Sequence, residues 1–330
     1  MKRIGLMAAA LFIGVVPVLA NDSTASLGAG GLVLTQSADI RMASEDLYIS
    51  KDVIRVRYEF VNDARTPITT RVAFPLPEAN LRELYESDVG WPTEKGDNVV
   101  DFRVVVDGRA VVPQLERKAF LNGQDVTAVL TRLGVPISPR PHEVAAVIGK
   151  LSPAAKRELV RLKLSNITAD YVEPLWVVKN VYHWPQTFPA GRPLRVEHTY
   201  KPIAGGSFFS ALGYREDPKM FDKYYKDYCI DASTRAGIAS RLNALQRRDG
   251  DNAMMVQWVV DYVLTTAKNW KGPIGQFRMT LDKGKPQNVI SFCMDGPVRK
   301  SGATTFVVER RNFVPARDFT MMIFEPARAP

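Results

Sequence analysis

The sequence has few of the residues that enzymes most often use for chemistry. Its 330 residues include only three histidines and two cysteines. It contains no G-x-S-x-G or S-x-x-K nucleophile motif and no H-E-x-x-H zinc pattern. A glycine-rich phosphate-binding loop follows a strand, but no strand pattern precedes the clustered glycines near the N-terminus. These absences favour a binding protein over an enzyme, and they indicate no metal or other cofactor.

Long apolar runs are also missing, except at the start of the chain. Lys2 and Arg3 precede an uncharged, mainly apolar run that ends in small residues at Val18 and Ala20. This pattern predicts a signal peptide over residues 1–20, cleaved after Ala20. A membrane anchor is the alternative, but the run is short and is interrupted by glycine and proline. No later stretch approaches the ~20 apolar residues of a transmembrane helix, so we expect an exported, periplasmic protein without a membrane span after cleavage.

The two cysteines, Cys229 and Cys293, have no metal-binding spacing and no neighbouring histidine. In an oxidising compartment, an isolated pair of this kind predicts one disulfide.

The balance of charges is positive. Removal of the signal peptide leaves 42 basic and 35 acidic residues, a net charge of +7. Such an excess favours anionic surfaces, so we expect the partner to be another envelope protein or an anionic envelope polymer. Nucleic acid is a poor candidate for an exported protein. Nothing in the sequence determines the oligomeric state.

Alternating apolar residues predict strands along most of the chain. Residues 54–60 show this period of two, and Asp107-Gly108 is a strong hairpin signal. Helical patterns are concentrated at about 123–170 and again at 233–248. We therefore predict a β-rich α+β fold. Residues 21–205 would form an antiparallel β-sandwich-like domain with a helical insertion at about 123–170, and residues 206–330 a smaller α+β domain.

The alternative hypothesis is a hydrolase or metal-dependent enzyme that acts on envelope material and uses histidines for its chemistry. On the strand pattern, His198 faces the same way as its apolar neighbours, and His183 faces away from the tyrosine and tryptophan beside it. Chemistry would require these two imidazoles to converge, with a carboxylate such as Glu197 or Asp170 orienting one of them. Histidines that are simply part of a sheet core are more common.

Aromatic residues offer a second set of candidates. Tyr224 and Tyr225 belong to a segment, 214–228, in which rings alternate with lysines and arginine, a mixture that suits sugar stacking or a membrane interface. An interdomain segment with inward-facing rings is the simpler interpretation. Trp176 and Trp184 likewise fit a core better than a carbohydrate platform.

Short motifs in a fixed order resemble an uncharacterised bacterial family, domain of unknown function 4424. The resemblance implies a secreted bacterial protein with no established activity and no catalytic residues to assign. The motifs are Gly31-Leu32-Val33-Leu34, Ser44-Glu45-Asp46-Leu47, Val72-Ala73-Phe74-Pro75-Leu76-Pro77, Thr199-Tyr200-Lys201-Pro202, Asn269-Trp270-Lys271-Gly272-Pro273-Ile274 and Val289-Ile290-Ser291-Phe292-Cys293.

A second resemblance concerns the N-terminal part alone. Val106-Asp107-Gly108-Arg109, Glu116-Arg117-Lys118-Ala119 and Phe188-Pro189-Ala190-Gly191 are similar to the vault protein inter-alpha-trypsin domain, an antiparallel β-sandwich used for association. The helical insertion departs from that domain, so the resemblance implies a sandwich and leaves the partner surface open.

Overall fold

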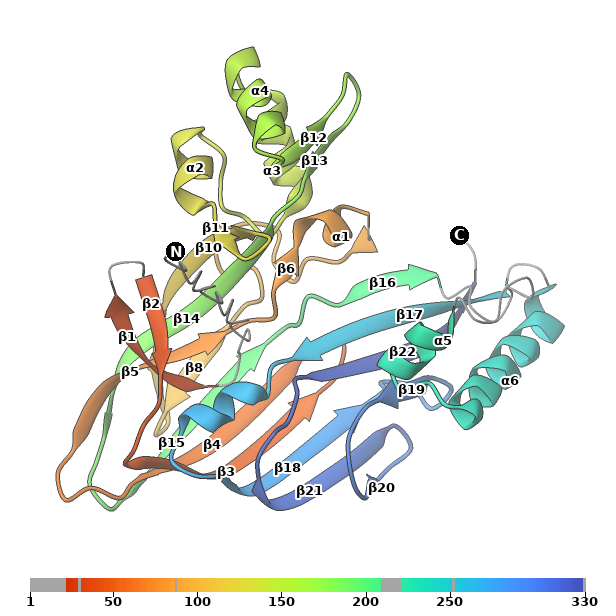
Figure 1. Cartoon of the computed structure of the whole chain (residues 1–330). Coiled ribbons are helices and arrows are strands. Elements are labelled where there is room, and N and C mark those ends of the chain that lie inside the picture. Colours follow the sequence, from red (N-terminus) through yellow and green to blue (C-terminus); the bar gives the residue numbers. More distant parts are fainter. Residues whose placement is uncertain (1–21, 29–30, 87, 209–220, 251–252, 329–330) are drawn as a thin grey trace, which may run out of the picture.

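The computed structural model describes residues 22–28, 31–86, 88–208, 221–250 and 253–328. The predicted signal peptide and residues 214–220 of the aromatic segment lie outside these ranges. Three large sheets pack together, and the helices lie around them (Figure 1). The β-rich α+β class predicted from the sequence is confirmed. Over the described residues, no helix is long and apolar enough to cross a membrane.

The largest sheet has eight strands in the order β20-β21-β18-β3-β4-β15-β8-β9. Neighbouring strands are antiparallel except β18 and β3, which are parallel. In β4 and β15 every second side chain is buried, as the alternation in the sequence predicts. The bounds are β3 Ile40–Ile49, β4 Ile54–Asn62, β8 Arg103–Val106, β9 Arg109–Val111, β15 Pro193–Tyr200, β18 Ile274–Asp282, β20 Arg299–Lys300 and β21 Thr305–Phe313.

A seven-stranded sheet packs on one part of the inner face of this sheet. Its order is β11-β10-β14-β5-β1-β2, with β6 pairing one end of β14. Tyr182, Trp184 and Phe188 of β14 join the core between the two sheets. The bounds are β1 Ser23–Gly28, β2 Gly31–Thr35, β5 Ile68–Pro75, β6 Ala79–Asn80, β10 Gln114–Leu121, β11 Gln124–Asp125 and β14 Val177–Phe188.

A five-stranded sheet, in the order β19-β22-β17-β16-β7, covers the rest of that face. Val260 and Tyr262 of β17 point into the shared core, so Val259 and Asp261 lie on the opposite face of the strand. The bounds are β7 Asp88–Val89, β16 Gly205–Phe208, β17 Ala253–Tyr262, β19 Val289–Phe292 and β22 Phe319–Arg328. A 3₁₀ helix, η3 (Thr265–Asn269), follows β17.

The predicted helical insertion contains three short helices and a hairpin that project from the seven-stranded sheet (Figure 1). They have an apolar core of their own, which includes Leu130, Ile148, Leu159 and Trp176. Ser152 caps one helix by accepting a hydrogen bond from the Ala155 amide, as its Ser-Pro start predicts. The bounds are α2 Thr127–Arg132, α3 Pro141–Gly149, α4 Pro153–Arg161, β12 Ser165–Ile167 and β13 Val172–Pro174.

Helices α5 (Asp222–Asp227) and α6 (Ala232–Asp249) lie against the outer face of the five-stranded sheet, where Ile238 of α6 packs with Met255 and Phe324. Asp231 caps α6 by accepting from the Thr234 amide. A disulfide joins Cys229 and Cys293 with a Cα–Cα distance of 5.3 Å, which confirms the predicted pairing.

The main core extends across the domain boundary expected near residue 205. It contains buried side chains from both sides of that point, among them Leu47, Trp184, Met279 and Ile323. Strand β18 also lies beside β3 in one sheet. Residues 206–330 therefore share both a sheet and a core with residues 21–205.

Candidate functional site

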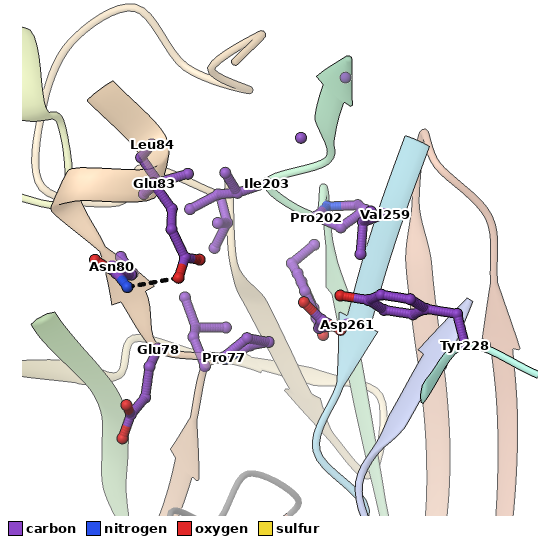
Figure 2. A pocket seen from close by; sticks show the side chains of 16 residues that line it. Pro77, Glu78, Asn80, Glu83, Leu84, Pro202, Ile203, Tyr228, Val259 and Asp261 are labelled. Carbon is purple, nitrogen blue, oxygen red and sulfur yellow. Dashed lines mark hydrogen bonds between the residues drawn. The ribbon is translucent and has the colours of Figure 1, made fainter. Parts of the chain in front are cut away.

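A cavity of about 280 Å³ lies where the seven-stranded and five-stranded sheets meet above the largest sheet. Segments far apart in the sequence form its walls: the connection around β6 with the start of α1, the residues that follow β15, the far face of β17 and the turn after α5 (Figure 2). The lining residues are Leu76, Pro77, Glu78, Ala79, Asn80, Glu83, Leu84, Val100, Tyr200, Pro202, Ile203, Gly205, Gly206, Tyr228, Val259 and Asp261.

Helix α1 (Leu81–Tyr85) supplies one wall. Its capping residue Asn80 accepts a hydrogen bond from the Arg82 amide at 3.2 Å. The Asn80 side-chain amide also donates to Glu83 Oε1 at 2.8 Å, and Figure 2 shows this contact at the cavity. Leu81 is fully buried, which fixes the short helix against the protein. The cap and the buried leucine together hold the Glu83 carboxylate at the cavity.

Asp261 of β17 supplies the opposite wall. Thr320, its cross-strand partner on β22, donates a hydrogen bond to its carboxylate at 2.6 Å. The side chain is open to water in the cavity but is surrounded by protein. This enclosure raises the pKa of Asp261; the Thr320 bond opposes the rise, and the Asp318 and Glu83 carboxylates add to it. Asp261 therefore lies in a region of negative potential.

Tyr228 lies on the same side as Asp261 (Figure 2). It directly precedes the disulfide residue Cys229, and its carbonyl accepts a hydrogen bond from the Ser291 hydroxyl at 2.9 Å. Its ring contacts that of Tyr224, with centroids 5.0 Å apart. Burial raises the pKa of Tyr228, and the carboxylates of Asp261 and Glu83 contribute to the rise. The disulfide and the serine bond thus fix the backbone that carries this tyrosine.

Tyr200, at the end of β15, reaches the cavity from the largest sheet. Only 3% of the residue is exposed, yet it lines the cavity. Within the part of the chain that the structure describes, its hydroxyl has no hydrogen-bond partner. Burial raises the pKa of Tyr200, and Asp261 adds to the rise. The hydroxyl is therefore available to water or to a molecule that enters the cavity.

The charged side chains among the described lining residues of the cavity are all acidic. No lysine, arginine or histidine occurs among its described lining residues, although three carboxylates do. Glu78 is paired with Lys179 at 2.7 Å, and Glu83 and Asp261 also line the cavity. Leucine, proline, valine and isoleucine complete the walls. The arrangement can hold a small molecule with an apolar body and a polar group, but it contains no paired nucleophile and base.

The structure does not bring the two candidate histidines together. His198 is 1% exposed and lies inside the core, where its Nε2 is 3.0 Å from both carboxylate oxygens of Asp22. Its ring contacts that of Trp184, which lies on the opposite face of β14 from His183. The convergence that the enzymatic alternative requires is therefore absent.

His183 lies on the other side of its sheet, where Arg71 Nη1 donates to its Nδ1 at 2.8 Å. Burial lowers the pKa of His183, and the Arg71 charge lowers it further. The carboxylates proposed as orienting groups are elsewhere. Glu197 pairs with Arg57 on the exposed face of the largest sheet, and Asp170 is exposed in the turn between β12 and β13. In the described ranges, no group of three or more His, Cys, Asp or Glu residues is placed to hold a metal ion.

The aromatic candidates are packed inside the protein. Trp176 and Trp184 are 0% and 1% exposed, in two different apolar clusters, so neither ring can stack on a sugar. Tyr224 is half-buried and donates to Gln257 Oε1 at 2.6 Å. Tyr225 is also half-buried and has the Arg235 guanidinium 4.8 Å from its ring. Both tyrosines, like Tyr228, pack against the apolar cluster that contains Ile238, and Tyr228 also lines the cavity.

Neither Glu83 nor Asp261 was predicted from the sequence. Asp261 does leave a signal, because it is the one charged residue in the stretch 253–264. Glu83 leaves none, since a glutamate in a short polar helix is ordinary.

The family comparison agrees with the motifs in the sequence. Residues 20–322 match the model of a family described as Domain of unknown function (DUF4424). The chain belongs to this family. The match covers nearly all of the chain predicted to remain after cleavage, and it brings no known activity. No curated protein matches the chain. The resemblance to the vault protein inter-alpha-trypsin domain is not confirmed.

Solved structures give only distant likenesses. A candidate nutrient-binding protein from Legionella pneumophila has a TM-score of 0.47 and 16% identity, over 92% of this chain and 70% of that one. An M1 zinc metallopeptidase from Deinococcus radiodurans has a TM-score of 0.24 and 9% identity, over 88% of this chain and 43% of that one. At these scores neither likeness carries an argument about this DUF4424 protein.

Proposed function

We propose that this DUF4424 protein is an exported, periplasmic, non-catalytic binding protein that holds a small ligand in the cavity between the two smaller sheets. The observation that carries the proposal is the cavity itself, which is lined by Tyr200, a residue whose hydroxyl has no partner in the described structure. Apolar walls with a few converging polar groups are typical of small-molecule sites. The ligand would supply the hydrogen bond that the protein does not.

The exposed face of the largest sheet gives less support to the anionic polymer expected from the net charge. Its arginines alternate with carboxylates across neighbouring strands, so positive and negative charges are mixed. The pairs are Arg57 with Glu197, Arg195 with Glu59, Arg278 with Asp46 and Glu309, and Arg103 with Asp101. A surface of this kind lacks the continuous positive potential that concentrates a polyanion.

Filling the cavity tests the proposal. Ile203→Trp and, separately, Val259→Phe place a larger side chain in the lining. Val112→Trp is the matched control, because Val112 is 92% exposed and lies outside the lining. Each protein is melted with a panel of small organic solutes of positive, negative and neutral charge. A ligand at one hundred times its Kd stabilises the folded state by about 2.7 kcal/mol.

We expect at least one solute to raise the Tm of the wild type and of Val112→Trp, and to leave the Tm of the filled variants unchanged. Circular dichroism confirms that each variant is folded. The proposal fails if the wild type responds to no solute, or if the folded filled variants respond as strongly as the wild type.

A further inference from the structure

We infer that helix α4 and the residues beside it form a docking surface for an anionic lipid bilayer. The surface is a basic face of five cations: Lys150, Lys156, Arg157, Arg161 and Lys163. The inference goes beyond the proposed function, because none of these residues lines the cavity.

Positive charge is concentrated on this short segment. Residues 150–163 contain five basic residues and one acidic residue, a net charge of +4. The chain predicted to remain after cleavage has a net charge of +7. More than half of that excess therefore lies on the basic face.

The one acidic residue of the segment does not cancel these charges. Glu158 lies 2.9 Å from Nη2 of Arg161 and 3.8 Å from Nη2 of Arg132, so two guanidinium groups share one carboxylate. The hydrogen bond from Arg161 lowers the pKa of Glu158, and Arg132 lowers it further. Three members of the basic face are exposed and form no ion pair within the described ranges: Lys150, Arg157 and Lys163.

The geometry of the helix brings the cations together around an apolar side chain. Lys156 and Arg157 precede Val160 by four and three positions, which makes them its neighbours on the helix surface. Lys156 Nζ also donates to the Gly149 carbonyl at 2.6 Å, and this bond brings it beside Lys150 at the end of α3. Val160 is 48% exposed among these charges.

The acidic residues elsewhere in the projecting part leave its charge positive. Glu143 lies 3.8 Å from Arg140 Nε, and Glu173 is only 3% exposed. Asp170 is exposed in the turn between β12 and β13. Residues 127–174 together contain seven basic and four acidic residues.

The position of the basic face suits a flat partner. Helix α4 lies at the outer end of the projecting helices, far from the largest sheet (Figure 1). Its Leu159 packs into the separate apolar core of the projection, which turns the basic face away from the protein. Clustered cations attract anionic lipids, and an exposed apolar side chain among them can enter the headgroup region. A soluble polyanion would meet the same charges but would gain nothing from Val160, so the bilayer is the better partner.

Vesicle sedimentation with the full mature protein tests the inference. We expect binding to vesicles of equal parts phosphatidylglycerol and phosphatidylcholine, release by high salt, and no binding to phosphatidylcholine alone. Each cation at an anionic bilayer contributes a factor of about five to the Kd, so Lys150→Gln/Arg157→Gln/Lys163→Asn should weaken binding by about 100-fold. Asparagine is chosen at Lys163 because the backbone there has φ of 58°.

The matched control removes three exposed cations from α5 and α6, which lie elsewhere on the molecule (Figure 1). The variant Lys226→Gln/Arg241→Gln/Arg247→Gln changes the net charge by the same amount and should bind nearly as tightly as the wild type. Circular dichroism confirms that both triple variants are folded.

A fluorescent label tests whether α4 itself contacts the lipid. Val160→Cys and, separately, Val112→Cys are labelled without reductant, which preserves the Cys229–Cys293 disulfide, with a dye whose emission shifts to the blue in apolar surroundings. Val112 is 92% exposed and lies outside the basic face. We expect phosphatidylglycerol vesicles to shift the emission of the first label and not that of the second.

Several results would overturn the inference. They are a wild type that does not bind phosphatidylglycerol vesicles, a folded basic-face variant that binds like the wild type, a control variant that loses binding equally, and a Val160→Cys label that vesicles leave unchanged or shift no more than the Val112→Cys label. Binding to soluble polyphosphate without binding to vesicles would also overturn it, in favour of an anionic polymer. The proposed function stands or falls separately, since the solute experiments concern the cavity alone.

Discussion

The contact between Asp22 and His198 joins two ionisable side chains that are both buried in the core and lie 176 positions apart in the sequence. Trp270 Nε1 donates to the Asp22 carbonyl at 2.6 Å and fixes the backbone beside the carboxylate. Burial raises the pKa of Asp22, and the imidazole of His198 opposes the rise. His198 therefore has a structural role in the core, away from the cavity.

Replacing this histidine should destabilise the protein. His198→Leu leaves the Asp22 carboxylate buried without its imidazole partner, which costs about 3–5 kcal/mol for a broken buried pair. The double variant Asp22→Asn/His198→Leu removes the charge as well and should recover part of the loss. Urea unfolding measures the free energy of each protein. A loss below about 1 kcal/mol in the single variant, or no recovery in the double variant, would contradict this role.

The sequence predicts which way a single side chain faces better than it predicts what that side chain meets. Alternation along β15 places His198 inward with Leu194 and Val196, and the structure confirms it. Alternation along β14 likewise places His183 on the opposite face from Trp184. The partner of His198 could not be predicted, because Asp22 lies on a distant segment and nothing local marks it.

At the scale of elements, the Cys229–Cys293 disulfide connects the turn after α5 to the end of β19, and Tyr228 lies next to it at the cavity. The double variant Cys229→Ser/Cys293→Ser should lower the free energy of unfolding by up to about 4 kcal/mol in the chain-entropy model. We also expect a weaker response to solutes that bind the cavity, because the backbone that carries Tyr228 loses its covalent attachment.

The measurement is urea unfolding combined with melting in the presence of the solutes, on the wild type with and without reductant and on the double variant. Reductant should shift the wild type towards the variant and leave the variant unchanged. An unaltered response to the solutes in a folded double variant would show that Tyr228 is held without the disulfide.

Strand elements were predictable because their alternation is local. The alternating stretch at residues 54–60 lies in strand β4, and the hairpin signal Asp107-Gly108 joins β8 to β9. The caps of α4 and α6 are equally local signals, a serine before proline and an aspartate. The cavity was not predictable, since its walls come from α1, β17 and the residues after β15, which meet only when three sheets pack.

At the scale of the whole molecule, the parallel neighbours β3 and β18 connect the two ends of the chain. About 230 residues separate the paired positions, for example Asp46 and Arg278. Such a pairing leaves no trace in local composition, so the sequence did not predict that the main core contains residues from both sides of position 205.

The same architecture bears on where the mature chain begins. Asp22 is fully buried and bonded to His198 and Trp270, although it is only two positions beyond the predicted cleavage point. We propose that signal peptidase cleaves after Ala20, so that the exported protein begins at Asn21 and retains Asp22. N-terminal sequencing of the protein recovered from the periplasm tests this. Retention of Met1 in the envelope fraction, or a start at or beyond Ser23, would exclude it.

Two shortened proteins test whether the position of the first residue changes the stability of the fold. One begins at Asn21 and the other at Ser23, each produced behind the same exchangeable leader. The second protein lacks Asp22, whose carboxylate contacts His198 and whose carbonyl accepts from Trp270 Nε1. The imidazole of His198 and the indole N–H of Trp270 would then be buried without these partners. Each lost buried partner costs about 1–3 kcal/mol, so we expect the shorter protein to unfold at clearly lower urea concentration. Equal midpoints would show that the core tolerates the loss of Asp22 and would remove the structural reason for cleavage at Ala20.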